Sequence, residues 1–330
     1  KWVNKKRPIL INNWEGTYFD FTEEKLLQMA ETAHKAGVEL FVLDDGWFGK
    51  RNNDTCSLGD WKVNYDKLPS GIDGLAEKIN KIGMKFGLWF EPEMISPDSD
   101  LYREHPDWAI HIDEREGVQS RNQMVLDLSR DEVCEYVINA VSDILANANI
   151  EYVKWDMNRQ LTDMPRLGYN HEYTLGYYKI MSAITEKFPN ILFEGCSAGG
   201  GRFDAGVLAY MPQIWTSDNS DAIARLKMQY STSMCYPVYS ISSHVTASPN
   251  HQCGRVTTLK TRADVAYCGT FGYELDVTKM SDEEFKEIKA QIKFEKRIQD
   301  LMCNGDLYRL INPYETNYCS WEVISKDKKH

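Results

Sequence analysis

The sequence lacks the features that mark several large classes of protein. Its net charge is −11 at pH 7, so there is no excess of basic residues with which to bind a nucleic-acid backbone. No apolar run approaches the ~18 residues that a membrane-spanning helix needs, and residues 1–14 do not have the profile of a signal peptide. No glycine-rich GxGxxG or P-loop motif follows the first predicted strand. These absences argue against nucleic acid, a membrane and a nucleotide cofactor as partners.

The eight cysteines and seven histidines also lack the spacing of disulfide or metal sites. No two cysteines form a CxxC pair, and Cys134, Cys235 and Cys268 lie in apolar runs typical of buried free thiols. The histidines show no HxH or HExxH pattern. We therefore predict no metal and no cofactor, and a cytoplasmic location, because a reducing compartment keeps thiols free. The chain begins at Lys1 without an initiator methionine, which we interpret as a fragment of a longer polypeptide.

The sequence does contain a repeat of a short apolar strand followed by an amphipathic helix. Helices are predicted at residues 22–36, 72–82, 131–146 and 173–188, and the first two end at Gly37 and Gly83. Strands are predicted at residues 8–13, 40–43, 86–90, 124–128, 152–156, 191–196, 214–218 and 238–244. Eight strands that alternate with helices match a closed (β/α)8 TIM barrel of the α/β class. An open, doubly wound sheet is the alternative.

The last part of the chain departs from this repeat. Residues 282–303 predict a long amphipathic helix, and residues 307–310 and 318–323 are typical of β-strands. We therefore assign residues 1–303 to the catalytic barrel and residues 304–330 to the beginning of a truncated C-terminal β-domain.

Carboxylates gather at the ends of the predicted strands, where the active site of such a barrel forms. They are Asp44, Asp45, Glu91, Glu93, Asp127, Asp156, Glu194 and Asp218. One carboxylate after a strand commonly caps a helix, but eight around one rim repel each other and indicate a function. In the absence of metal-ligand spacing, sugar hydroxyls are the ligand that paired carboxylates suit best.

The segment Lys154-Trp155-Asp156-Met157-Asn158 is the most informative of these strand ends. Side chains alternate along a strand, so Lys154, Asp156 and Asn158 share one face. A lysine beside Asp156 would keep that carboxylate ionised, which suits a nucleophile; a buried structural ion pair is the alternative. Asp218 follows Trp215, whose apolar shelter favours a protonated carboxyl and therefore a general acid. The alternative for Asp218 is a helix N-cap.

Five segments together resemble the bacterial α-galactosidases of glycoside hydrolase family 36. They are Asp44-Asp45-Gly46-Trp47-Phe48-Gly49, Gly87-Leu88-Trp89-Phe90-Glu91-Pro92-Glu93, Lys154-Trp155-Asp156-Met157-Asn158-Arg159, Gly199-Gly200-Gly201-Arg202-Phe203-Asp204 and Trp215-Thr216-Ser217-Asp218-Asn219. The resemblance implies a retaining exo-glycosidase that hydrolyses terminal α-galactosides, such as raffinose-type oligosaccharides, melibiose and galactosylated glycans. Asp156 then matches the nucleophile and Asp218 the acid/base, with their carboxyl groups ~5–5.5 Å apart.

The same resemblance implies a substrate pocket and an assembly state. The residues that match substrate-binding positions are Trp14, Asp44, Asp45, Trp89, Arg121, Lys154, Asn158, Cys196, Ala198 and Trp215. Ala198 is a departure, because the family often has glycine there, beside the residue that matches the sugar's C2 contact. It keeps an α-N-acetylgalactosaminidase or related 2-amino-sugar glycosidase open as an alternative. A raffinose-synthase-like transglycosylase and a non-catalytic sugar-binding barrel are further alternatives, and family members often form homotetramers.

Overall fold

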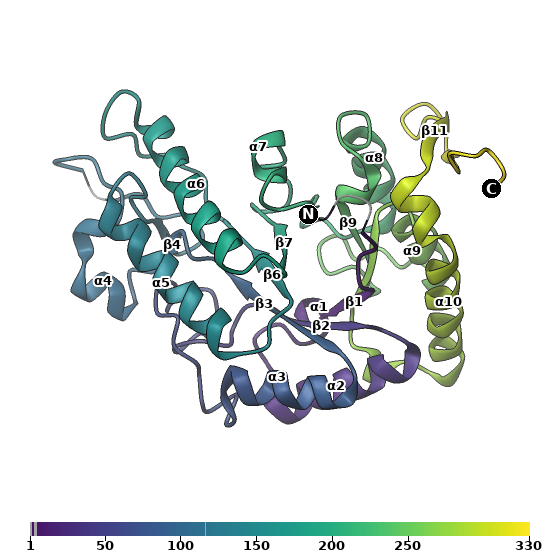
Figure 1. Ribbon diagram of the computed structural model, residues 1–330, viewed down its shortest axis with the longest axis horizontal. Coiled ribbons are helices and arrows are strands. Elements are labelled where there is room, and N and C mark those ends of the chain that lie inside the picture. Colours follow the sequence, from purple (N-terminus) through teal and green to yellow (C-terminus); the bar gives the residue numbers. More distant parts are fainter. Residues whose placement is uncertain (1, 3–4, 116) are drawn as a thin grey trace.

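Eight parallel strands close into a barrel in the computed structural model, which describes residue 2, residues 5–115 and residues 117–330 (Figure 1). Their order around the barrel is β1-β10-β9-β8-β7-β6-β3-β2, and β2 pairs with β1 to close the ring. The strands are β1 (Leu10–Asn12), β2 (Leu40–Leu43), β3 (Lys85–Phe90), β6 (Tyr152–Trp155), β7 (Leu192–Gly195), β8 (Gln213–Trp215), β9 (Ile241–Thr246) and β10 (Thr270–Glu274). The prediction of a (β/α)8 barrel is confirmed, and the open-sheet alternative is wrong. Lys1, where the predicted barrel domain begins, lies outside the described residues.

Helices lie between the strands along the chain, and the longer ones cover the outside of the barrel (Figure 1). They are α1 (Trp14–Thr17), α2 (Glu23–Ala36), α3 (Gly71–Ile82), α4 (Asp100–Glu104), α5 (Asp131–Asn147), α6 (Tyr169–Lys187), α7 (Ala205–Leu208), α8 (Ala222–Thr232), α9 (Leu259–Ala266) and α10 (Asp282–Asn304), with 3-10 turns η1 (Pro106–Trp108), η2 (Val238–Ser240) and η3 (Val277–Lys279). Figure 1 shows α2 beside α3 and α5 beside α6, and these pairs pack together. Helices α2 and α3 end at Gly37 and Gly83 with φ of 104° and 103°, the left-handed conformation that favours glycine.

One of the eight predicted barrel strands lies outside the barrel, and one barrel strand, β10, was not predicted. Residues 124–128 contain β5 (Met124–Val125), which pairs antiparallel with β4 (Met94–Ile95) outside the barrel. Strand β6 instead pairs directly with β3, and β10 completes the barrel between β9 and β1. A short apolar run has the same sequence pattern whether it pairs inside a barrel or beside it. Strand β8 also ends at Trp215, so Asp218 stands in the following loop rather than on a strand.

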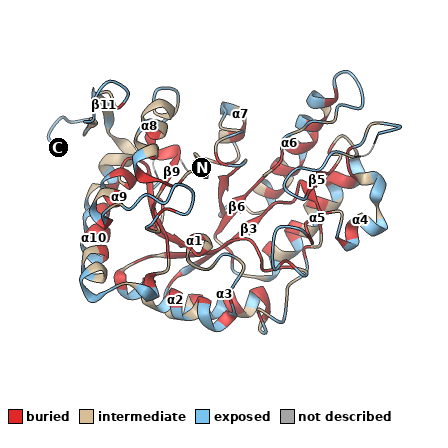
Figure 2. Cartoon of the chain, turned by 180° about the vertical axis from the view of Figure 1, so that it is seen from behind, coloured by how far each residue is buried: buried red, intermediate tan, exposed pale blue. Residues whose placement is uncertain are grey.

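The barrel interior is closed below the strand ends by apolar side chains. Leu10, Leu40, Val42, Tyr152 and Leu192 form a buried cluster from four barrel strands. A larger core lies between the strands and the helices, as the red strands and red inner helix faces in Figure 2 show. Polar side chains follow this apolar floor at the carboxyl ends of the strands, which is where a cavity can form.

The chain ends in a small antiparallel pair of strands. Helix α10 begins with a capping box formed by Ser281 and Glu284 and leads into β11 (Asp306–Ile311), which pairs with β12 (Ser320–Ile324). The predicted terminal strands at 307–310 and 318–323 are therefore present. Among the described residues, no helix has the length and apolar character needed to cross a membrane.

Candidate active site

A cavity of about 320 Å³ opens at the carboxyl ends of the barrel strands. Ten of the twelve residues predicted from the sequence for catalysis or binding line it. They are Trp14, Asp44, Asp45, Trp89, Arg121, Lys154, Asp156, Asn158, Trp215 and Asp218. The structure thus brings together residues that are up to about two hundred positions apart in the chain, as the parallel topology requires.

Asp156 follows β6 and is held rigidly. It is buried, and its backbone N–H donates to the Phe90 carbonyl at 2.7 Å. Its Oδ2 accepts from the Trp89 indole N–H at 3.2 Å and from Asn158 Nδ2 at 2.7 Å, and its Oδ1 accepts from the Met157 backbone N–H at 2.8 Å. Both carboxylate oxygens therefore act as acceptors and have fixed directions.

Lys154 pairs with Asp44 rather than with Asp156. Its Nζ lies 2.9 Å from Asp44 Oδ2, and both side chains are buried. Burial opposes the charge of Lys154, but the carboxylates of Asp44 and Glu274 outweigh it and raise the pKa of Lys154 well above its usual range. The predicted common face of Lys154, Asp156 and Asn158 is present, since all three line the cavity. The long side chain of Lys154 reaches the end of β2, so its ion-pair partner is Asp44, while the charge of Asp156 acts on it as a smaller contribution.

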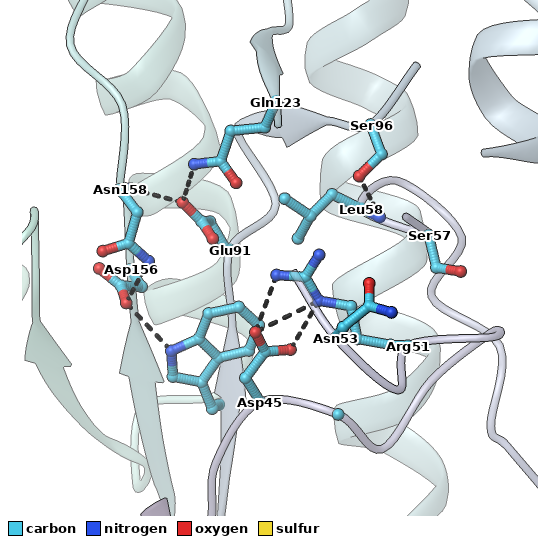
Figure 3. Close-up of polar contacts among 12 residues, drawn as sticks. Asp45, Arg51, Asn53, Ser57, Leu58, Glu91, Ser96, Gln123, Asp156 and Asn158 are labelled. Atoms are coloured by element: carbon cyan, nitrogen blue, oxygen red, sulfur yellow. Dashed lines mark hydrogen bonds and ion pairs between the residues drawn. The ribbon is translucent and has the colours of Figure 1, made fainter. Parts of the chain in front are cut away.

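Asp45 is fixed by a buried arginine. Arg51 Nε lies 3.0 Å from Asp45 Oδ1, and its Nη2 lies 2.8 Å from Oδ2, while Arg51 Nη1 donates to the Cys56 carbonyl at 2.9 Å. This two-pronged contact, visible in Figure 3, leaves little freedom to the carboxylate. Asp44 and Asp45 therefore enter the cavity as neighbours that are each held by a different cation.

Glu91 lies beside Asp156 in the same close-up (Figure 3). Its Oε1 accepts from Gln123 Nε2 at 2.9 Å and from the Asn158 backbone N–H. Burial, reinforced by the negative charge of Asp156, raises the pKa of Glu91 to about 8. Glu91 thus connects the segment that carries Asn158 to β3, and its own charge is suppressed next to Asp156.

Asp218 has a different setting. It stands in the loop between β8 and α8, and its Oδ1 is 4.0 Å from the Cys196 thiol. Burial, reinforced by the negative charge of Asp156, raises the pKa of Asp218 to about 6. A carboxyl group with this pKa can give a proton and take it back near neutral pH.

Aromatic and cationic side chains complete the walls. Trp215 is buried, with the Arg225 guanidinium 4.3 Å and the Lys154 ammonium 5.8 Å from its ring centroid. Trp14, on α1, packs edge-on against Tyr18 and Phe19. Arg121 is exposed at the rim with a left-handed backbone, φ of 53°.

Cys196 and Ala198 do not line this cavity. Cys196 is buried behind Asp218 and borders a smaller neighbouring cavity; burial and the charge of Asp156 raise the pKa of its thiol well above the usual range. Ala198 is exposed, and its backbone has a φ of 46°. That left-handed conformation explains why glycine is the easier residue at this position.

Several lining residues were not predicted. They are Glu15, Tyr18, Phe19, Arg51, Asp54, Glu91, His251, Gln252 and Glu274. Glu91 was recognised only as one of the acidic strand ends, and Glu274 was missed because it ends the unpredicted strand β10. Burial opposes the charge of Glu274, but its 3.0 Å contact with His244 and the charge of Lys154 lower its pKa. Only the position of Glu15 next to Trp14 could have drawn attention to it.

Three of the predicted acidic strand ends have other partners. Glu93 bonds Arg202 and the Trp155 indole, Asp127 bonds Tyr169 and Ser129, and Glu194 bonds Gln213. These carboxylates fix loops and strands rather than the cavity. No group of three or more histidine, cysteine or acidic side chains in the described residues is arranged to hold a metal ion.

The sequence matches the melibiase family over residues 1–305. It is 54% identical over 333 residues to alpha-galactosidase AgaA of Geobacillus stearothermophilus, a match that covers 98% of this chain and 46% of that protein. It is 49% identical over 336 residues to alpha-galactosidase Mel36A of Lactobacillus acidophilus, covering 99% of this chain and 46% of that protein. The chain therefore spans about half the length of these curated relatives.

Solved structures agree with this similarity. The crystal structure of the GH36 alpha-galactosidase AgaA superposes with a TM-score of 0.97 at 55% identity, covering 98% of this chain and 46% of that one. Variants of AgaA have been crystallised with raffinose and with stachyose. The chain belongs to the melibiase family, and its predicted place in glycoside hydrolase family 36 is confirmed.

Proposed function

We propose that this chain is the catalytic barrel of a retaining α-galactosidase that removes terminal α-linked galactose by double displacement. One observation carries the proposal: two aspartates line the same cavity in opposite settings. Asp156 has three N–H donors on its carboxylate, whereas Asp218 has few partners and a pKa raised to about 6 by burial and by Asp156. A fixed carboxylate opposite a protonatable acid is the pair that a retaining glycosidase uses.

The two residues divide the chemistry between them. In the first step Asp156 attacks the anomeric carbon while Asp218 gives its proton to the departing oxygen, so one C–O bond forms as the other breaks. In the second step the Asp218 carboxylate takes a proton from water, which attacks the same carbon and releases Asp156. Two inversions return the galactose with its original configuration.

The remaining polar side chains serve to hold the sugar. From the resemblance to glycoside hydrolase family 36, we assign Asp44 and Asp45 to the O4 and O6 side of galactose. Their carboxylates line the cavity and are held by Lys154 and Arg51, which supports a binding role. The other proposed substrate contacts are Arg121, Lys154 and Asn158, with Trp14, Trp89 and Trp215 as aromatic walls. Cys196 lies outside the cavity lining, and we propose that it packs beside Asp218. No metal or other cofactor enters this proposal.

Galactose is preferred over 2-amino sugars in this proposal. The alternative of an α-N-acetylgalactosaminidase depended on Ala198, whose side chain is exposed and outside the cavity lining. The AgaA variants bind raffinose and stachyose, which supports galactosylated oligosaccharides as substrates here. We infer the same substrate class for the protein that contains this chain.

The wider context is also a proposal. We place the end of the barrel domain at residue 303 and the start of a β-domain at residue 304, a division supported by the β11–β12 pair that follows α10. We further propose a homotetramer and a cytoplasmic location. All eight cysteines, which lie in the described residues, are free thiols, as is usual in a reducing compartment.

The test is a product analysis with the full-length protein. We expect proton NMR to show α-galactose as the first product from 4-nitrophenyl α-galactoside, with β-galactose appearing only by later mutarotation. The matched N-acetylgalactosaminide and α-glucoside should be hydrolysed far more slowly. First release of β-galactose would contradict retention, and preference for another sugar would contradict the assigned substrate.

A further inference from the structure

Asp218 is held mainly by hydrogen bonds to its backbone and to its loop, and hardly by bonds to its side chain. Within the described chain, its carboxylate has a single hydrogen-bonding neighbour, the Cys196 thiol at 4.0 Å. Its carbonyl oxygen, in contrast, accepts from Gln252 Nε2 at 2.9 Å. The position of the carboxyl group therefore depends on how firmly the loop at residues 216–221 is held.

Two residues after Asp218, the loop is fixed to three other parts of the molecule through Ser220. The Ser220 carbonyl accepts from Thr246 Oγ1 at 3.0 Å, and its hydroxyl accepts from Asn250 Nδ2 at 3.0 Å. The same hydroxyl donates to Glu15 Oε1. Ser220 and Asn250 are buried, so these bonds are shielded from water.

Glu15 contacts both the Asp218 loop, through Ser220, and the segment that follows β9. It lies on α1, its side chain is 3% exposed, and its Oε1 also contacts His251 Nδ1 at 3.3 Å. Its Oε2 accepts from the Ala247 backbone N–H at 3.1 Å. Although Glu15 borders the cavity, protein groups occupy both of its oxygens. It is therefore suited to hold the two loops together and not to contact the sugar.

We propose that Glu15 is a positioning residue that fixes the Asp218 loop through Ser220. The inference rests on the proposed acid/base role of Asp218, since its kinetic consequence is the quality of proton transfer. When the loop is loosened, protonation of a poor leaving group should suffer while departure of a good one is spared, because only the former needs the proton.

Hydrogen exchange of the full-length protein tests the positioning directly. We expect Ser220→Ala, a small change that should fold, to raise the exchange rate of the amides at residues 216–221, and Glu15→Gln to do the same. Glu23→Gln is the matched control, because Glu23 is also buried at a helix start and bonds the Ser70 backbone N–H at 3.0 Å outside the cavity. Unchanged exchange in Ser220→Ala would overturn the proposal.

Kinetics of the same variants test the consequence. For Ser220→Ala and Glu15→Gln, kcat/KM should fall about tenfold or more on melibiose and less than about threefold on 4-nitrophenyl α-galactoside. The loss in the double variant should be smaller than the two single losses combined, because both changes break the same Ser220–Glu15 hydrogen bond. Equal loss on both substrates, or additive losses, would overturn the positioning role.

The two proposals fail in different ways. If the wild-type protein hydrolyses neither galactoside, the proposed function is wrong, and hydrogen exchange alone then decides whether Glu15 holds the loop. If the wild type is active and Asp218→Ala shows the expected dependence on leaving group, but Ser220→Ala and Glu15→Gln keep the wild-type ratio, only the positioning role of Glu15 is wrong.

Discussion

Asp156 and Asp218 face one cavity from two different supports. Asp156 directly follows barrel strand β6 and is fixed by three N–H donors and its own backbone. Asp218 stands three residues beyond a short strand, in a loop whose bonds run to α1 and to the segment after β9. The barrel itself therefore positions the proposed nucleophile. The proposed acid/base, Asp218, stands instead on a loop whose position depends on a few hydrogen bonds.

The largest effect is expected when the firmly held carboxylate of Asp156 is removed. Asp156→Ala should lower kcat on 4-nitrophenyl α-galactoside by about 10⁴-fold or more, because it removes the proposed nucleophile. Steady-state kinetics of the full-length variant measure this. Loss of less than tenfold would assign the nucleophile elsewhere.

Removing the carboxyl group of Asp218, which stands on the loop, should lower activity by an amount that depends on the substrate. Asp218→Ala is expected to lower kcat/KM on melibiose by about 10²–10⁴-fold, the usual contribution of a general acid. On 4-nitrophenyl α-galactoside the first step should change little, since that leaving group departs without a proton. Paired kinetics on the two substrates provide the measurement. An equal loss on both would remove Asp218 from the acid role.

Removing one hydrogen bond to Asp156, while keeping its carboxylate, should cause an intermediate loss of activity. Asn158→Ala deletes the 2.7 Å donor to Asp156 Oδ2, and a hydrogen bond to a charged group contributes about 1.5–3 kcal/mol. We therefore expect kcat to fall by about ten- to a hundredfold on both melibiose and the aryl galactoside. A loss confined to one of them would show that Asn158 does not act through Asp156.

The pH profile can separate the two aspartates. In the proposed mechanism the first step needs Asp218 in its protonated form, so kcat/KM on melibiose should fall as pH rises through about 6, the value to which burial and Asp156 raise its pKa. Above that pH the slope should approach tenfold per unit. Asp218→Asn should lack this limb, and its persistence in that variant would identify a different acid.

The smallest effect is expected in the turn beside the loop. Ala198 has a φ of 46°, and its neighbour Gly199 packs so closely that an added Cβ would lie 2.6 Å from Ser217 Cα. Ala198→Gly relieves a left-handed alanine and should raise the free energy of unfolding by about 1 kcal/mol. Urea denaturation measures this. Selectivity between galactose and N-acetylgalactosamine should not change, because the Ala198 methyl lies outside the cavity.

Strand–helix periodicity was enough to predict the barrel but not all of its members. Residues 124–128 have the apolar pattern of a strand, yet they belong to the excursion between β3 and β6. Residues 270–274 form a short run that contains a glycine and were not predicted as a strand, although they pair with β1 and β9 in the barrel. Membership of a barrel is decided by which backbone accepts the hydrogen bonds, and that partner is not local in sequence.

The same limit applies to the site. Alternation along β6 correctly placed Lys154, Asp156 and Asn158 on one face, but it could not show that Lys154 reaches Asp44, 110 positions away. The partners of Glu15 are further still, at separations of 205 and 232 residues. The positions of the strand ends predict which residues line the cavity. The side-chain contacts that hold those residues, such as those of Glu15, depend on how the loops fold and cannot be predicted from strand periodicity.

The composition of the cavity wall has a consequence for what it binds most tightly. Eight carboxyl groups from the described residues line it, against three lysine or arginine side chains. Even with Glu15 and Glu91 neutral, since their pKa is raised to about 8 by burial and neighbouring carboxylates, acids outnumber bases. A neutral sugar gains little from such a field, but an anomeric carbon that becomes positive as its bond breaks gains much. If the cavity acts as proposed, its excess of carboxylates stabilises the positive charge of the transition state, and a sugar analogue with a permanent positive charge in the ring should bind more tightly than galactose.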